Sequence, residues 1–244
     1  MPLFAHKLHH RCFLLVKHSR HFLEKEKLVD LTKKYPLTDS LQILSQIPNA
    51  KFDEAVEFTV KLGINTKHSD QQVRGTLILP HGVGKKTRIC VVAKDAKLAE
   101  AEAAGADFIG GDELVEKIKS GWVDFDVLIT TPDMMKSVGT LGKVLGKRGL
   151  MPSPKTGTIT IDIKKAVEDF QKGKAEYRAD KYGIVHMSVG RKSFSADQLK
   201  ENIVAVYDAL QKAKPSTSKG VYVRGVYLSC TMGPGIEMDA MAMN

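Results

Sequence analysis

Residues 88–135, RICVVAKDAKLAEAEAAGADFIGGDELVEKIKSGWVDFDVLITTPDMM, decide the fold, because three short apolar runs alternate in them with helix-like stretches. The runs are Arg88–Val92, Asp107–Ile109 and Val127–Thr130. Continuous apolar character over so few residues is typical of strands buried on both faces of a parallel sheet. The alternation predicts a small parallel sheet covered by helices on both faces, which is a Rossmann-like α/β arrangement.

Capping and breaking residues mark the helices expected in this stretch. Asp95 is suited to cap a helix from Lys97 to Ala104, and Gly105 is suited to end it. A second helix is expected near Glu113–Lys119, and Thr131-Pro132 opens another with proline at its first position. The predicted order is therefore β-α-β-α-β, followed by a further helix.

The segments on either side of this stretch follow a different pattern. From Phe52 to Leu62 apolar residues alternate with Asp53, Glu57 and other polar residues, which predicts a strand with one buried face. Two later apolar segments are further strand candidates: Ile184–Val189 and Val221–Cys230. We expect these strands to form a second sheet.

One amphipathic helix is expected between the last two of these strands. Ser195 and Gln198 have the spacing of a capping box, and the helix should run to about Lys214. Its apolar residues recur every three or four positions, so one face must be covered. The simplest arrangement is that the two ends of the chain form one discontinuous α+β domain, into which the α/β domain is inserted.

Glycine-rich joints separate the two expected domains. The segment from Pro80 to Gly84 precedes the first strand of the α/β unit, and Gly173 follows its last helix. Glycine accepts large changes in φ and ψ, so these two connections could act as a hinge at Gly82, Gly84 and Gly173. The expected boundaries are residues 1–82 and 174–244 for the discontinuous domain and residues 83–173 for the insertion.

Gly82-Val-Gly84-Lys85 resembles a phosphate-binding loop but lacks its essential residues. A P-loop requires glycine where Leu79 stands, and a serine or threonine where Lys86 stands. A dinucleotide fingerprint fails as well, because its third glycine would be Thr87. With no nucleophile, acid–base or metal-ligand arrangement elsewhere, we expect no enzyme activity, no cofactor and no metal. Asp124 and Asp126 are expected to be a solvated pair.

The charge balance favours a polyanionic partner. The formal net charge is +9 and the isoelectric point is about 9.3. Residues 83–173 hold 15 basic and 13 acidic side chains, a balance of +2, so the flanking segments hold the remaining +7. If the partner is RNA, its main contacts are expected on the discontinuous domain.

Cysteine spacing and hydropathy also constrain the protein. Cys12, Cys90 and Cys230 stand far apart without metal-ligand spacing, so reduced thiols are expected rather than a disulfide framework or a zinc site. No apolar run approaches the length of a membrane span. We expect a chain that contacts no membrane and is a monomer when free.

The first 23 residues contain five of the eight histidines and no acidic residue. One interpretation is an amphipathic organelle-targeting peptide, which would be rich in arginine and poor in acids. The other is a basic arm that contacts RNA phosphates or stays disordered. Arg11 and Arg20 are the only arginines there, which favours the second interpretation and a cytoplasmic location.

The run from Leu145 to Gly157 combines glycines, prolines and cations. So many breaking residues in 13 positions are expected to exclude regular structure. The run could be a solvated loop, or it could dock on a phosphate backbone through Lys147, Arg148 and Lys155.

Residues 142–157, GKVLGKRGLMPSPKTG, resemble the signature of the bacterial form of the ribosomal proteins that build the lateral stalk of the large subunit. Shorter stretches agree in order along the chain. They are Lys51-Phe-Asp-Glu54, Lys61-Leu-Gly-Ile64, Ser69-Asp-Gln-Gln-Val-Arg-Gly75, Leu79-Pro-His-Gly82, Asp124-Phe-Asp126, Lys214-Pro215 and Thr231-Met-Gly-Pro-Gly235. The resemblance covers about residues 28–239. The family usually has proline where this chain has Lys147 and asparagine where it has Ser153, so this loop departs from the family pattern by one added cation and one lost proline.

The resemblance implies a discontinuous α+β domain that binds a stalk of large-subunit ribosomal RNA. It also implies help in releasing transfer RNA from the exit site, and repression of the protein's own operon by binding its messenger RNA. Phe52 could instead be a core residue, and a general RNA-binding regulator would share the basic surface. The contacts implied by the family motifs are Lys51, Phe52, Lys181, Thr231, Met232 and Gly233.

Overall fold

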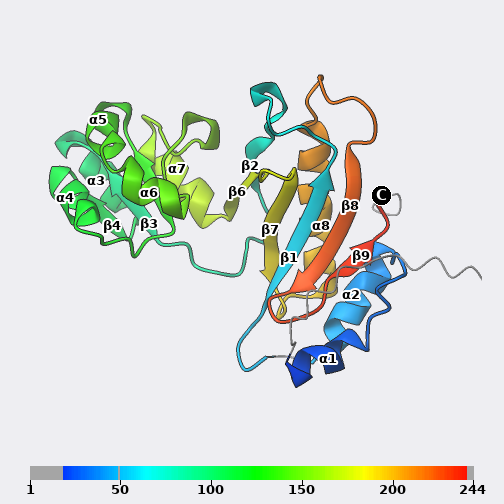
Figure 1. The fold of residues 1–244 in the computed structure, drawn as a ribbon. Coiled ribbons are helices and arrows are strands. Elements are labelled where there is room, and N and C mark those ends of the chain that lie inside the picture. The colour runs from blue at the N-terminus through cyan, green and yellow to red at the C-terminus, as the bar shows by residue number, and fades with distance from the viewer. Residues whose placement is uncertain (1–18, 49, 241–244) are drawn as a thin grey trace, which may run out of the picture.

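The computed structural model describes residues 19–48 and 50–240 and contains two larger sheets joined by a short ribbon (Figure 1). The first sheet has four antiparallel strands in the order β7-β1-β8-β9. The N-terminal basic segment up to His18 lies outside the described residues. The strands of this sheet are β1 (Ala55–Leu62), β7 (Ile184–Arg191), β8 (Val223–Cys230) and β9 (Ile236–Met238).

One face of this sheet is buried and the other is open. Along β1 every second residue is buried, from Val56 to Leu62, and these side chains pack against the helices α2 (Leu37–Gln46) and α8 (Ala196–Lys212). Glu57 and Lys61 point to the opposite face and are exposed. The predicted strand alternation is therefore confirmed, with the strand beginning three residues after Phe52.

The predicted capping box of α8 is present. The Ser195 hydroxyl accepts a hydrogen bond from the Gln198 N–H (3.3 Å), and the Gln198 side chain accepts one from the Ser195 N–H (3.1 Å). Asn202 lies on the buried face of this helix with no exposed surface. Its amide donates to the carbonyls of Val189 (2.7 Å) and Gly82 (3.1 Å), and its carbonyl accepts from the His81 N–H (3.1 Å). Asn202 therefore links the connection that leaves the first sheet, at His81 and Gly82, to strand β7.

The second sheet has three parallel strands in the order β4-β3-β5, as the alternation predicts. Its strands β3 (Ile89–Val92), β4 (Phe108–Gly110) and β5 (Val127–Thr130) are short. Neighbouring residues point to opposite faces, because Cys90 joins one buried cluster and Val91 another. The helices around them are α3 (Asp95–Ala103), α4 (Asp112–Lys119), α5 (Met135–Gly139), α6 (Gly142–Arg148) and α7 (Ile163–Gln171).

Two expectations about this unit were wrong in detail. Helix α3 begins at Asp95, so this residue occupies the first helical position, and Lys94 is the cap residue. The run from Leu145 to Gly157 contains regular structure, because α6 continues to Arg148 before Gly149 ends it in the left-handed conformation. Buried Leu145 anchors that last turn in the core, which outweighs the breaking residues around it.

A two-stranded ribbon joins the two larger sheets. Strand β2 (Arg74–Ile78) leaves the first sheet and pairs antiparallel with β6 (Lys174–Arg178), which returns to it. Next to the ribbon, a Cβ added to Gly173 would lie 2.6 Å from Gly82 Cα, so the two connections touch where only glycine fits. Gly82, Gly84 and Gly173 all have positive φ.

The buried residues form three clusters that follow the sheets. One cluster draws its buried residues from 29–79 and 177–238, and the other two draw theirs from 89–170. Cys90 and Cys230 are buried free thiols, and burial raises the pKa of the former to about 12 and of the latter to about 11. Among the described residues, none of the helices has the length and apolar character to cross a bilayer, and no cluster of three potential metal ligands occurs.

Candidate RNA interface

Five of the six contacts implied by the family motifs lie together at one end of the first sheet. Lys51 and Phe52 precede β1, and the turn of Thr231, Met232 and Gly233 follows β8. We call these five residues the clamped patch. They meet because β1 and β8 are antiparallel neighbours, which brings the start of one beside the end of the other.

Thr231 joins the two segments through the backbone of Ala55. Its N–H donates to the Ala55 carbonyl (3.1 Å). Its hydroxyl accepts from the Ala55 N–H (3.0 Å) and donates back to the Ala55 carbonyl (3.3 Å). The single hydroxyl proton is therefore already used, and one lone pair of Thr231 Oγ1 is left for a ligand.

Glu54 holds the two segments of the patch from below. It is 1% exposed, and one carboxylate oxygen accepts from the Ala50 N–H (2.7 Å) while the other accepts from the Met232 N–H (3.3 Å). The Lys25 ammonium, on helix α1 (Arg20–Glu26), donates to Glu54 (3.3 Å) and to the Met232 carbonyl (3.2 Å). Three separate segments of the chain thus converge under the patch.

This network also decides the charge state of Glu54. Burial opposes ionisation, but the N–H groups of Ala50 and Met232 and the ammonium of Lys25 outweigh it and lower the pKa of the carboxyl. The carboxylate is therefore ionised at neutral pH and neutralises a lysine that is itself 6% exposed. A buried, hydrogen-bonded ion pair of this kind fixes the positions of the segments it joins.

The outer surface of the clamped patch is apolar and accessible. Phe52 is 53% exposed and Met232 is 55% exposed, which excludes the alternative that Phe52 is a core residue. Lys51 beside them is exposed and adds positive charge. An aromatic ring, a thioether and a cation, held on two joined segments, are suited to pack on ribose or bases and to reach a phosphate.

The structure separates Lys181 from the clamped patch. Lys181 lies in the turn before β7, beside the far end of β1, where Thr66 donates to its carbonyl (2.6 Å). About six residues of β1 separate the two places, or about 20 Å at the usual rise of a strand. If Lys181 and the patch contact one RNA, that RNA must extend along the sheet.

Lys181 instead lines a cavity that it shares with a residue of the inserted segment. Together with Lys155, from the single-turn helix η3 (Pro154–Thr156), it lines a cavity of about 920 Å³ between that turn and the ribbon. Lys147 and Arg148 are exposed in the last turn of α6 and do not line it. The cations of the loop predicted as one basic surface therefore lie in two places, with Lys155 in the cavity and Lys147 and Arg148 on α6.

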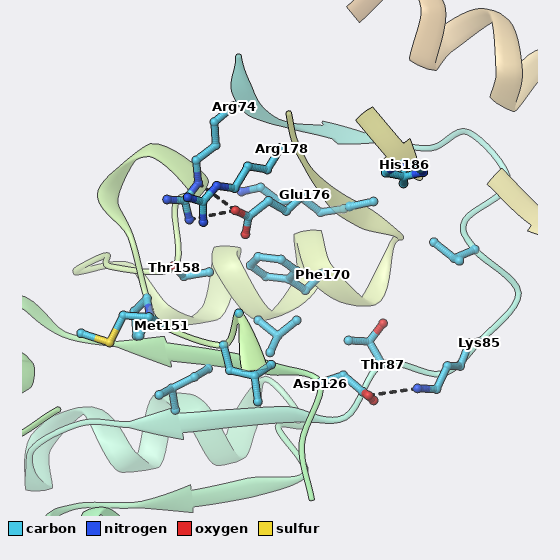
Figure 2. Close-up of a pocket in the computed structure, with 18 residues that line it drawn as sticks. Arg74, Lys85, Thr87, Asp126, Met151, Thr158, Phe170, Glu176, Arg178 and His186 are labelled. Atoms are coloured by element: carbon cyan, nitrogen blue, oxygen red, sulfur yellow. Dashed lines mark hydrogen bonds and ion pairs between the residues drawn. The ribbon is translucent and has the colours of Figure 1, made fainter. Parts of the chain in front are cut away.

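A second cavity, of about 520 Å³, adjoins the ribbon (Figure 2). Arg74 and Arg178 lie side by side there, and Arg74 forms a salt bridge with Glu176 (2.8 Å). On the opposite wall Lys85 contacts Asp126 (2.9 Å), which also accepts from Arg88. Although burial opposes ionisation, these partners lower the pKa of Asp126. The expectation of a solvated pair holds for Asp124, which is exposed, and was wrong for Asp126, which is half-buried and ion-paired.

Three residues of this architecture escaped the sequence analysis. Glu54 stands inside the quoted motif Lys51-Phe-Asp-Glu54, and its place at the start of a strand could have marked it. Lys25 and Asn202 are indistinguishable by sequence from ordinary exposed helical residues. Their roles depend on partners more than a hundred residues away, Met232 in one case and His81 in the other.

The structure thus defines a basic chain with an antiparallel sheet and a parallel α/β unit joined by a two-stranded ribbon. Comparison with known proteins gives its family. The chain belongs to the Ribosomal protein L1p/L10e family, whose profile matches residues 44–234. It is similar to the "Large ribosomal subunit protein uL1" of Kosmotoga olearia, with 50% identity over 223 residues, which is 91% of this chain and 96% of that protein. The whole clamped patch lies within the residues that the family profile matches, whereas Lys25 precedes them.

Proposed function

We propose that this chain is a structural constituent of the large ribosomal subunit that binds the ribosomal RNA of the lateral stalk. The observation that carries the proposal is the clamped patch, in which exposed Phe52 and Met232 are held by the buried Glu54–Lys25 pair. The proposal is supported by membership of a ribosomal protein family and by the similarity to a large-subunit protein. Its place of action is the ribosome in the cytoplasm.

The chemistry of the patch suits recognition of folded RNA. Double-stranded RNA offers proteins its shape, its ribose hydroxyls and its phosphates, because its major groove is too deep and narrow for side chains. Gly233 adds little bulk and is partly exposed, so backbone can come close to a ribose. The rigid turn gives shape selection, and Lys51 adds an attraction that does not depend on sequence.

The proposal includes two further roles, in release of transfer RNA from the exit site and in repression of the protein's own operon by binding messenger RNA. Repression needs the clamped patch to accept a messenger RNA fold that resembles the ribosomal site. The protein acts in them as a monomeric binding protein without catalysis, cofactor or metal.

We also propose that residues 1–82 with 174–244 and residues 83–173 are separate units that turn about a hinge. The separate buried clusters support the division. The touching glycines Gly82 and Gly173 support the pivot, because side chains there would block rotation. A moving stalk would use such a joint to change the angle between RNA and the inserted unit.

A binding titration tests the proposed function. The purified chain is titrated with a fluorescent RNA of the large-subunit stalk, and with an unrelated hairpin of the same length, at two salt concentrations. Selective binding to the stalk that survives the higher salt is expected. Equal and salt-sensitive binding to both RNAs would overturn the proposal and leave a general RNA binder.

A further inference from the structure

The ribbon carries two like charges in direct register. Arg74 on β2 is paired with Arg178 on β6, and directly opposed residues of an antiparallel pair have adjacent side chains on the same face. Glu176, two residues away on β6, forms a salt bridge with Arg74. Within the described part of the chain, Arg178 has no salt-bridge partner and is exposed, so one guanidinium charge remains without a counter-charge.

The larger cavity beside the ribbon concentrates further cations. It is lined by Lys67, Arg74, Lys155, Arg178 and Lys181, with Asp180 as the one acidic residue of its lining. The Asp180 carboxylate already accepts hydrogen bonds from the N–H groups of Tyr182 and Ile184, both 2.8 Å long. We call this cavity the ribbon cleft.

We propose that the ribbon cleft is a second RNA site, which takes the phosphodiester backbone of the same RNA that the clamped patch holds. This inference rests on the proposed function and extends it from one contact surface to two. The cations come from the loop before β2, the ribbon, the η3 turn and the turn before β7, so they line a wide cleft and not a small closed pocket. A wide, open row of cations fits a chain of phosphates.

The neighbouring side chains favour RNA over a small anion. Tyr182 lines the same cleft, is 68% exposed, and has the Lys181 ammonium 5.0 Å from its ring centroid. An exposed ring beside cations provides a face on which an unpaired base can stack. Arg178 and Arg74 can each offer a planar fork to phosphate oxygens, and phosphate would relieve their mutual repulsion.

The site also joins the two proposed units through one ligand. Lys155 belongs to residues 83–173, whereas Lys181 belongs to residues 174–244. A phosphate backbone lying between them would attract both walls and hold them at one distance. The RNA would thus fix the setting of the hinge as well as add affinity.

The test compares salt dependence between two charge-matched variants. The cleft variant carries Arg178→Gln and Lys155→Gln, and the control carries Lys117→Gln and Lys119→Gln on α4, at the far side of the inserted unit (Figure 1). Each loses two positive charges. The full-length chains are titrated with the stalk RNA and with the unrelated hairpin over a range of potassium chloride.

We expect the cleft variant to bind the stalk RNA about three- to tenfold more weakly, with a salt slope smaller by about 1.4 to 1.8, as for two lost phosphate contacts. The control should keep the wild-type slope. Equal slopes for the two variants would overturn the second site. Because removal of Arg178 relieves repulsion, the cleft variant is not expected to unfold, and its melting temperature checks this.

The outcomes separate the two proposals. If wild type fails to prefer the stalk RNA, the proposed function falls, while the slopes measured on the hairpin still decide whether the cleft contacts phosphate. A wild type that binds neither RNA overturns both. In a further arm, inorganic phosphate is added at ionic strength matched with chloride. If phosphate alone abolishes the difference between wild type and cleft variant, the occupant is a small anion, and the RNA assignment is wrong.

Discussion

The two ends of the first sheet use positive charge in opposite ways. Beneath the clamped patch Lys25 is buried and paired with Glu54, and the patch exposes two large apolar side chains, Phe52 and Met232, beside one cation, Lys51. At the ribbon cleft five cations are in reach of solvent, and two of them, Arg74 and Arg178, oppose each other in register. The clamped patch therefore has a fixed shape and few unpaired charges. The ribbon cleft has several unpaired cations on side chains that are less constrained.

This difference teaches how a basic protein can be selective. Exposed cations attract any polyanion, and that attraction falls as salt rises. A rigid apolar turn contributes little at a distance but distinguishes RNA folds on contact. Selectivity should therefore depend on the clamped patch, and salt dependence should depend on the ribbon cleft.

The largest effect is expected from Glu54→Gln. It leaves the Lys25 ammonium buried without a counter-charge, and loss of one partner of a buried pair costs about 3 to 5 kcal/mol. Urea unfolding should show this loss, and stalk RNA affinity should fall because the Met232 turn loses its anchor. The neighbouring change Asp53→Asn is the control, since that carboxylate is exposed and bonded to Ser193. Similar losses in both variants would remove the special role of the buried pair.

A smaller effect of the same kind is expected in acid. The folded pKa of Glu54 lies below its ordinary value of 4.5, so its contribution is complete above that pH and is lost as pH falls through the folded value. The stability difference between wild type and Glu54→Gln should therefore shrink as the pH falls below about 4.5. Asp30 and Asp126 also have lowered pKa values, and subtracting the variant removes their contribution. A constant difference would contradict the prediction.

The next effect concerns binding alone. Phe52→Ala with Met232→Ala should weaken stalk RNA binding by more than about 1 kcal/mol while the urea midpoint stays nearly unchanged, because both side chains are more than half exposed. Ile161→Ala removes an apolar side chain that is 64% exposed on the inserted unit and is the matched control. Thr231→Ala, in contrast, should lower stability too, since its hydroxyl holds Ala55. Unchanged binding in the double variant would remove the patch from the interface.

The smallest effect has the opposite sign. Arg178→Gln should stabilise the free protein by about 0.2 to 1 kcal/mol, because it removes a like charge directly across the ribbon. Arg74→Gln relieves the same repulsion but loses the salt bridge to Glu176, so its effect should be close to zero. Differential scanning calorimetry at low salt compares the two. A destabilised Arg178→Gln would mean that the pair is not repulsive.

The sequence predicted those parts of the fold that depend on neighbouring residues. Periodicity identified β1, β7 and the three parallel strands, and the spacing of Ser195 and Gln198 identified the start of α8. The ribbon was missed, because β2 and β6 are short and partly exposed and exist by pairing with each other. Helix α2 was missed as well, since Pro36 at its start bears no capping side chain.

The candidate site was predictable where a motif placed residues on one turn and not where the fold combined distant segments. Thr231, Met232 and Gly233 lie together in sequence and in space. The separation of Lys181 from Lys51 follows from strand length and antiparallel order, which become visible once the register of β1 and β7 is known. The Lys25–Glu54 pair forms because α1 packs beside the start of β1, and no local sequence pattern predicts that packing.

The hydrogen bond between Lys25 and Met232 also has a consequence for synthesis of the chain. During synthesis the helix that carries Lys25 is made about two hundred residues before the turn that carries Met232. Glu54 lies between them in the sequence and contacts both in the folded protein. β1 in turn is closed on one side by β8, near the end of the chain. A nascent or prematurely terminated chain that lacks the Met232 turn therefore holds no finished patch, and we expect it to compete poorly for the proposed RNA.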